Sequence, residues 1–319
     1  MKRKLYLSIA IILFPAMIYL VIFFANDPHG YFQVKSNSTS AESHPLIENM
    51  LEWKNGHYNA ILIGDSRMGA FDAYIDDLNA YTGKNYKNMS YPGAMATEMN
   101  YLIRWCLDNS QEHVDSIIIV SGWYNFNELL QQNRVESTKK IIENPFTYAF
   151  SVDNLRDFII SMKKDEKTDD TEGEIAEDIS LSDNLTSKED SFLTTFNGMW
   201  NRYLSGFELS KTEIDELINI SYYCKDHNIS LVFVVPPWVD WFYTELESRA
   251  AYDMDDYKRI LSQYFDIIDF EFIECQLCHN TQDFSDVSHF HGQTYEAFAR
   301  ELITGEPIYS RIWNNGNVK

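Results

Sequence analysis

Short, continuous apolar runs alternate with longer amphipathic segments along most of the chain. Runs rich in β-branched residues lie at 60–63, 116–121, 230–235 and 266–270, and a shorter strand-like run lies at 86–89. Because they do not alternate with polar positions, they are typical of strands covered on both faces. Helix-length amphipathic segments lie between or after them, at 70–81, 94–109, 211–227 and 240–263. This order predicts a three-layer α/β/α domain with a parallel sheet of about five strands and right-handed crossovers.

The N-terminal region has a different pattern. Three basic residues at positions 2–4 precede an almost wholly apolar stretch, residues 5–25. A stretch of about 20 apolar residues can cross a bilayer as a helix, and the basic residues keep its N-terminal side in the cytoplasm. A cleavable signal peptide is the alternative, but Phe23 stands where a small residue is expected before Ala25. We therefore expect an uncleaved transmembrane signal-anchor in the cell membrane, with the following domain extracytoplasmic.

The remaining organisation follows from composition. We expect residues 1–4 to be a cytoplasmic tail, 26–56 a polar stalk, 57–305 the globular domain and 306–319 a C-terminal tail. Within the domain, residues 165–190 hold eleven acidic residues against two lysines, and we place the insertion around them at 163–192. Such a run cannot bury enough apolar surface to offset its ordering entropy, so we expect a disordered acidic insertion.

Bulk composition narrows the classes of function. The 319 residues, 45% of them apolar, can bury a large core. A formal net charge of −22 argues against a nucleic-acid surface, which needs clustered lysine and arginine. Four cysteines in a chain of this length do not make a disulfide scaffold.

Candidate chemistry lies at two distant places in the chain. Ser66 follows the first predicted strand, in Gly64-Asp65-Ser66, and Asp286 and His289 stand three residues apart far downstream. A serine hydroxyl becomes a nucleophile when an imidazole takes its proton and a carboxylate orients that imidazole. In a parallel α/β sheet, a residue just beyond a strand faces the ligand crevice. Ser66 as a simple helix cap is the alternative.

Four segments together carry a family resemblance. They are Gly64-Asp65-Ser66, Asn88-Met89-Ser90-Tyr91-Pro92-Gly93, Gly122-Trp123-Tyr124-Asn125 and Asp286-Val287-Ser288-His289. In order and approximate spacing they resemble the four blocks of the SGNH (GDSL) hydrolases, over residues 58–303. The resemblance implies a flavodoxin-like SGNH hydrolase fold, with Ser66 as nucleophile, His289 as base and Asp286 as its orienting acid. It also implies an oxyanion hole made by Ser66, Gly93 and Asn125, with no metal and no cofactor.

Several residues compete for these roles. The third block is one residue longer than the usual Gly-x-Asn-Asp and lacks the following acid, so Asn127 competes with Asn125. An oxyanion hole without an asparagine is the other alternative. His291 and Asp283 compete with His289 and Asp286 but lack the Asp-x-x-His spacing. Arg67 is interpreted as a surface or salt-bridge residue, with anion binding as the alternative.

A second motif is Cys275-Gln276-Leu277-Cys278-His279, which matches the haem-attachment pattern C-x-x-C-H. It lies between the last predicted strand and the Asp286–His289 block, which leaves little room for a porphyrin. We interpret the two cysteines as a disulfide or structural thiols, with haem attachment or a zinc site as alternatives.

These features favour a membrane-anchored extracytoplasmic serine esterase or O-acyltransferase. Within the family, anchored members resemble proteins of cell-surface polymer O-acetylation and D-alanylation, which implies a carbohydrate or acylated polymer substrate and a multi-span membrane-bound O-acyltransferase as partner. A catalytically degenerate binding or assembly protein on the same scaffold is the second hypothesis. A haem-carrying electron-transfer protein is a distant third.

Overall fold

The structure is a computed structural model that describes residues 13–15, 17–23, 45–150, 184–249 and 253–318. The chain divides into two compact units. The larger unit comprises the described residues of 53–133 and 178–319, and the smaller one those of 1–52 and 134–177. Each unit is described by itself below.

A mostly parallel sheet forms the centre of the larger unit. Its parallel strands are β1 (Ala60–Gly64), β2 (Tyr86–Asn88), β3 (Ser116–Val120), β4 (Ser230–Val235) and β5 (Ile267–Asp269). They lie in the order β2-β1-β3-β4-β5, and every residue of β1 and β3 is buried. The prediction of an α/β fold with parallel strands at these five places is therefore confirmed.

The C-terminal residues extend this sheet, which was not predicted. β6 (Arg311–Asn314) pairs antiparallel with β5, and β7 (Asn317–Val318) pairs antiparallel with β6. The sheet thus has seven strands and is mixed, whereas we expected about five strands and a tail over 306–319. Asn315 and Gly316 form the connecting turn, with φ of 51° and 77°, a left-handed pair that favours a tight hairpin.

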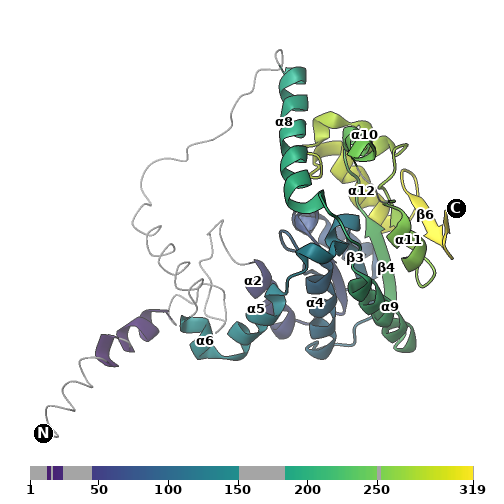
Figure 1. The fold of residues 1–319 in the computed structure, drawn as a ribbon. Helices are drawn as coiled ribbons and strands as arrows, with labels where there is room; N and C mark the ends of the chain where they lie inside the picture. The colour runs from purple at the N-terminus through teal and green to yellow at the C-terminus, as the bar shows by residue number, and fades with distance from the viewer. Residues whose placement is uncertain (1–12, 16, 24–44, 151–183, 250–252, 319) are drawn as a thin grey trace, which may run out of the picture. The chain divides into compact units, whose positions relative to one another are not determined.

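Helices connect the strands of the larger unit (Figure 1). They are the 3₁₀ helix η1 (Ser66–Tyr74), α3 (Ile75–Thr82), α4 (Ala96–Asp108), α9 (Lys211–Asp226), α10 (Asp240–Arg249), α11 (Asp256–Leu261) and α12 (Gly292–Thr304). α4 packs against α9, and α12 packs against α3. The chain moves from β1 to β2 in one direction along the sheet and from β2 to β3 in the other, so right-handed crossovers place α3 and α4 on opposite faces.

One longer helix and several short elements complete the larger unit. They are η2 (Trp123–Phe126), η3 (Glu128–Leu130), α8 (Asn184–Met199), the π-helix η5 (Trp200–Leu204), η6 (Gln276–His279) and η7 (Thr281–Asp283). The predicted helix over 70–81 is instead divided between η1 and α3, and the one over 240–263 between α10 and α11.

The smaller unit is helical among its described residues. Residues 13–15 and 17–23 are helical, and α5 (Arg134–Glu143) and α6 (Pro145–Phe150) follow the larger unit's first part. The buried Phe23 ring lies edge-on to Tyr148, with ring centroids 5.3 Å apart. Phe146 and Phe150 of α6 are 64% and 55% exposed.

Several expectations concern residues that the structure describes only in part. Most of the predicted anchor and stalk, and residues 163–183 of the predicted acidic insertion, lie outside the described residues. Among the described residues, α2 (Pro45–Asn55) is a helix in the region predicted to be stalk. α8 begins at Asn184, inside the predicted insertion. No helix within the described ranges is both long and apolar enough to span a bilayer.

Candidate active site

Ser66 stands where the sheet topology directs a ligand. β1 and β3 are neighbours although β2 separates them in sequence, and ligands of doubly wound sheets bind at such a switch point, beyond the carboxyl ends of the strands. Asp65 directly follows β1 and is the N-cap residue of η1. Its carboxylate accepts a hydrogen bond from the Arg67 N–H at 3.0 Å. Ser66 is therefore the first residue of a helix. Its N–H has no acceptor among the described residues.

The predicted nucleophile, base and acid lie in one hydrogen-bonded chain. The Ser66 Oγ is 2.7 Å from the His289 Nε2, and the His289 Nδ1 is 2.6 Å from an Asp286 carboxylate oxygen. The other Asp286 oxygen accepts from the backbone N–H groups of Ser288 and His289, each at 2.8 Å. The structure thus brings Ser66 together with two residues more than 200 positions downstream, in the order that proton transfer from a serine requires.

A short loop holds His289 and Asp286. Phe284 and Phe290 form an antiparallel bridge at the base of the loop, and both rings are buried. The Ser285 N–H donates to the His289 carbonyl at 2.9 Å. The loop is therefore closed by backbone bonds on each side of the two functional residues.

The electrostatics of the pair favour an ionised acid beside a basic imidazole. Burial alone raises the pKa of Asp286, but hydrogen bonds from the His289 ring and from two backbone N–H groups outweigh it and hold the pKa at about 2. The hydrogen bond to Asp286 raises the pKa of His289 against the opposing effect of burial. His289 is therefore a stronger base than a free imidazole.

Arg67 is buried in an ion pair and does not lie at the surface. Its Nε and Nη2 donate to the two Asp65 oxygens at 3.0 and 2.8 Å, and both side chains are 1% exposed. Burial alone raises the pKa of Asp65, but the Arg67 charge beside it lowers that pKa below its ordinary value. Of the two interpretations of Arg67, the salt bridge is the one that the structure contains.

Asn125 connects its own segment to the first resembling segment and to the residue that follows the second. Its amide nitrogen donates to the Ala94 carbonyl at 2.8 Å and to Asp65 at 3.2 Å, and its oxygen accepts from the Gly122 N–H at 2.9 Å. Both amide protons are thus engaged and the side chain is fully buried. In the absence of a substrate, both protons therefore have acceptors within the protein, and the role of Asn125 as an oxyanion donor stays a prediction.

The other oxyanion candidates are placed differently. Gly93 is exposed in the turn between β2 and α4, with φ of 68°, a conformation that favours glycine. Asn127 is buried, and its side-chain oxygen accepts from the Leu129 N–H at 3.1 Å, which caps η3.

The competing histidine and acid have structural positions. Asp283 accepts from the Thr294 N–H at 2.8 Å, near the start of α12. His291 is exposed and precedes that helix as its N-cap residue. Neither lies in the hydrogen-bonded chain from Ser66.

Aromatic side chains enclose the Arg67 guanidinium. Its central carbon lies 5.2 Å from the Tyr124 ring centroid and 5.3 Å from that of Trp238, and the Tyr124 hydroxyl donates to Asp65. Trp123 and Trp238 are at most 1% exposed. These aromatic residues therefore pack around the Asp65–Arg67 ion pair, whose two residues flank Ser66 in sequence.

A second buried ion cluster follows β5, which sequence reasoning missed. Lys258 is fully buried and contacts Asp269 and Glu271 at 3.0 and 3.2 Å. Trp238 donates to Glu271 at 2.8 Å, so the same indole that stacks on Arg67 also bonds this cluster. Burial raises the pKa of Glu271 to about 7, against the lowering effect of the Lys258 charge. Acidic residues directly after a predicted strand were the available signal.

The cysteine motif is built into the fold as thiols. Cys275 and Cys278 are free and fully buried, and the Cys278 thiol lies 3.5 Å from the Phe270 carbonyl. His279 is exposed and its Nδ1 lies 2.8 Å from Asp240. Within the described part of the chain, no group of three potential ligands is arranged to hold a metal ion. The two buried free cysteines agree with the structural-thiol interpretation.

Comparison with known proteins adds little to this geometry. No protein-family model matches the chain, and no curated protein matches it. Among solved structures, one of a candidate acylhydrolase from Bacteroides fragilis NCTC 9343 is 8% identical. The match covers 77% of this chain and 86% of that chain, with a TM-score of 0.35. Similarity of this extent does not establish shared chemistry, so the functional conclusion rests on the residues themselves.

Proposed function

We propose that this protein is a serine esterase or O-acyltransferase of the SGNH type that works through an acyl-enzyme on Ser66. The observation that carries the proposal is the continuous hydrogen-bonded chain from Ser66 through His289 to Asp286. A buried serine-histidine contact could serve packing alone, but here Ser66 is partly exposed and sits at the switch point of the sheet.

The geometry supports a two-step acyl transfer. As the Ser66 oxygen attacks the acyl carbon, the His289 Nε2 takes the hydroxyl proton, and the carbonyl oxygen becomes an oxyanion. His289 then gives that proton to the departing alkoxide, which leaves the acyl group on Ser66. Water or an acceptor hydroxyl repeats the sequence in reverse and releases the acyl group. Asp286 stays ionised throughout and stabilises the imidazolium.

Oxyanion stabilisation comes from the helix N-terminus in this proposal. The Ser66 N–H opens η1, where backbone dipoles favour negative charge. The Gly93 turn supplies the second donor. Asn125 positions that turn, because it binds the adjacent Ala94 carbonyl.

The setting is proposed on chemical grounds. The apolar stretch over residues 5–25 anchors the chain with its catalytic unit outside the cytoplasm. Exposed apolar side chains between Leu13 and Ile22, together with Phe146 and Phe150 of α6, suit a bilayer boundary. The substrates are then acyl esters of carbohydrate or cell-envelope polymers, and a multi-span membrane-bound O-acyltransferase is the proposed partner.

A fluorophosphonate probe tests the chemistry directly. An activated Ser66 displaces fluoride from the probe and becomes covalently labelled, and we expect full labelling of the folded full-length chain at this residue. Ser66→Ala and His289→Ala should abolish labelling. His291→Ala is the matched control and should label like the wild type, because its side chain lies outside the hydrogen-bonded chain.

The second candidate is a binding or assembly protein on the same scaffold, favoured by the engaged Asn125 amide. Absence of labelling in folded wild-type protein would support that candidate and contradict the enzyme. Once labelling is seen, release of the acyl group to water or to an added sugar hydroxyl separates esterase from transferase.

A further inference from the structure

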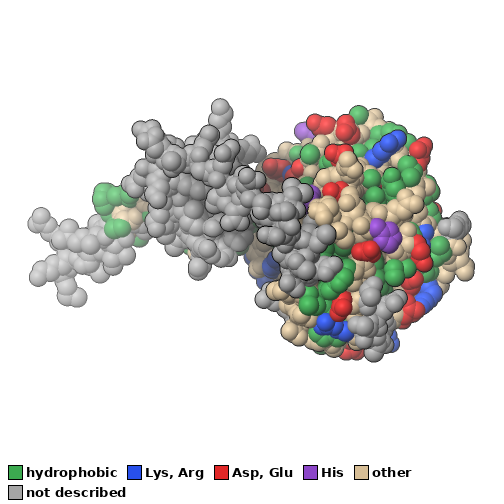
Figure 2. All heavy atoms as spheres, turned by 90° about the horizontal axis from the view of Figure 1, so that it is seen from above, with side chains coloured by type: hydrophobic (Ala, Val, Ile, Leu, Met, Phe, Trp, Pro, Cys, Tyr) green, Lys and Arg blue, Asp and Glu red, His purple; other side chains and the backbone are tan. Residues whose placement is uncertain are grey.

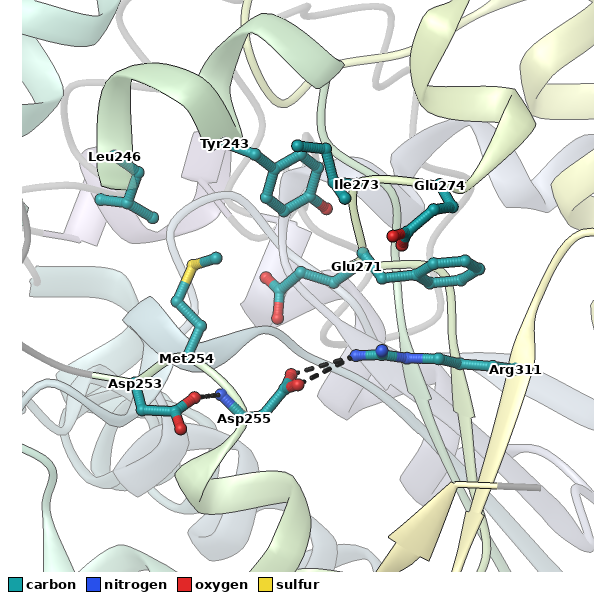
Figure 3. A pocket seen from close by; sticks show the side chains of 10 residues that line it. Tyr243, Leu246, Asp253, Met254, Asp255, Glu271, Ile273, Glu274 and Arg311 are labelled. Carbon is teal, nitrogen blue, oxygen red and sulfur yellow. Dashed lines mark hydrogen bonds and ion pairs between the residues drawn. The ribbon is translucent and has the colours of Figure 1, made fainter. Parts of the chain in front are cut away.

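A cavity of about 380 Å³ lies apart from Ser66, beside the last parallel strand (Figure 3). Its wall is formed by α10, by the residues before α11, by the segment after β5, and by the first residue of β6. The volume lies within the range of about 300–1,000 Å³ that is usual for small-molecule sites. The residues that line this cavity do not include Ser66, His289 or Asp286.

Two polar groups of the cavity have unused hydrogen-bonding capacity. Arg311 uses its Nε on Asp269, at 2.7 Å, and its Nη2 on Asp255, at 3.1 Å. Its Nη1 has no acceptor among the described residues. Glu274 is exposed and, within the same part of the chain, has no ionic or hydrogen-bonding partner. The cavity therefore offers a guanidinium donor and a carboxylate acceptor together.

The other carboxylates of the cavity already have cationic partners, and that of Asp253 is Arg259, outside the cavity. Asp255 contacts both Arg311 and Lys258, the latter at 3.0 Å. Glu271 contacts Lys258 at 3.2 Å and accepts from the Tyr257 hydroxyl at 3.1 Å. These groups are held rigidly, and little free charge of either sign is left for an ion.

This distribution selects against charged ligands. A ligand carboxylate binds a guanidinium most strongly through two parallel N–H groups, but in Arg311 the Nε and Nη2 already donate to Asp269 and Asp255, and Asp255 would repel the anion. For a cation, Glu274 is the one lining carboxylate without a cationic partner among the described residues, and the positive charge of Arg311 in the same cavity would repel the cation. A neutral ligand whose groups both donate and accept hydrogen bonds fits best, and hydroxyl groups do both.

The apolar part of the wall adds a surface for ring carbons. Leu246, Met254 and Ile273 line the cavity together with Tyr243 and Phe272. Figure 3 shows the Tyr243 ring and Ile273 on one side of the space, opposite Asp255 and Met254. A pyranose ring likewise has a polar part and an apolar part, with hydroxyl groups around its edge and C–H groups on its faces.

The cavity also lies at the edge of the sheet where Ser66 lies. Ser66 follows β1 and Glu271 follows β5, both at carboxyl ends. In the order β1-β3-β4-β5 these strands are three spacings apart, or about 14 Å at the usual distance between strands. A polymer of several sugar units can span this distance.

We propose that the cavity around Arg311 and Glu274 binds a non-reacting glycosyl unit of the polymer whose esters Ser66 attacks. The inference rests on the proposed function for the identity of the polymer, but saccharide binding itself needs no catalysis. Remote binding of this kind can be used to orient the reacting ester.

Saturation-transfer NMR on the full-length chain tests the proposal, in a detergent without a sugar headgroup. The probes are D-glucose, D-galactose and N-acetyl-D-glucosamine, with methylammonium and D-alanine as charged comparisons. We expect at least one sugar to bind with a Kd on the order of 1 mM, and neither charged probe to bind. Ser66→Ala should bind the sugar equally well.

Two variants locate the site. Glu274→Gln should weaken sugar binding at least five-fold, and Met254→Trp should abolish it by filling the space. Glu306→Gln, an equally exposed change outside the cavity, should leave Kd unchanged. The proposal is overturned if no sugar binds while fluorophosphonate labels Ser66, if methylammonium or D-alanine binds in place of sugars, or if both variants bind sugar normally. Sugar binding by a chain that is not labelled would contradict the enzyme and keep the site.

Discussion

The Arg67 guanidinium donates to both oxygens of the Asp65 carboxylate, and Ser66 stands between these two residues in sequence. A bidentate ion pair with both side chains 1% exposed constrains the backbone on each side of the serine. Because Tyr124 and Trp238 enclose the guanidinium, the pair cannot move without repacking its surroundings. The ion pair thus holds the backbone at Ser66 in a fixed position.

Breaking this pair should be strongly destabilising. Arg67→Met leaves the Asp65 carboxylate buried without its counter-charge, and we expect the free energy of unfolding to fall by about 3–5 kcal/mol. Denaturant unfolding of the full-length chain measures the change. The double variant Asp65→Asn/Arg67→Met should recover part of the loss, since no buried charge then remains. A loss below about 1 kcal/mol for Arg67→Met, the usual size for an exposed pair, would contradict the structural role.

The pH dependence of catalysis should report the Asp286–His289 pair. His289 must be neutral to accept the Ser66 proton, and its pKa lies above the ordinary value of 6.5 because of the hydrogen bond to Asp286. We therefore expect kcat/KM on a small ester to rise with pH through a midpoint above 6.5.

Removing the acid should move that midpoint in the opposite direction. Asp286→Asn takes away the group that raises the pKa of His289, so the rising limb should shift to lower pH. The rate at the plateau should fall about 10²–10⁴-fold, because the imidazole loses its orienting and stabilising carboxylate. An unshifted limb in this variant would show that another group controls the profile.

Asn125 can be tested as a clamp against its expected role as an oxyanion donor. Asn125→Ala leaves the Ala94 carbonyl and the Gly122 N–H without their present partner, so stability should fall by about 1–3 kcal/mol. A direct oxyanion donor would instead cost about 10²–10³-fold in kcat with little change in stability. Unfolding and kcat measured on one preparation separate the two, and a large kcat loss in a fully stable variant would favour the donor.

The parallel core and the serine site were predictable because they depend on local patterns. Buried parallel strands are continuous apolar runs, so β1, β3 and β4 are visible in the sequence. Asp286 and His289 stand three residues apart, and this spacing was the local signal that grouped them with Ser66. Once the strand before Ser66 is recognised, topology places the serine at the sheet edge.

What was missed depends on pairing across long distances. β6 is short and half-exposed, and it forms only because β5 offers a free edge and Asp269 accepts from Trp313 at 2.8 Å. The Asn315-Gly316 turn was the one local signal. Likewise, the use of both Asn125 protons depends on where Asp65 and Ala94 lie in space, which no spacing within the third segment reveals.

The buried Glu271 gives a last prediction, on stability against pH. Its pKa in the folded chain is about 7, compared with an ordinary value of 4.5. Between these values the folded chain holds a proton that the unfolded chain has released, so the free energy of unfolding should decrease as pH rises. His289, whose pKa is also raised, contributes a decrease at higher pH. The contribution of Glu271 is therefore isolated by comparing variants.

Glu271→Gln removes the titrating group and should flatten the decrease between pH 4.5 and 7, whatever it does to stability at a single pH. Urea unfolding at half-unit pH steps measures the slope. Glu306→Gln keeps an exposed glutamine in place of an exposed acid and should retain the wild-type slope. If Glu271→Gln also retains the wild-type slope, Glu271 is ionised throughout this pH range. The charge of Lys258 then lowers the pKa of Glu271 by more than burial raises it.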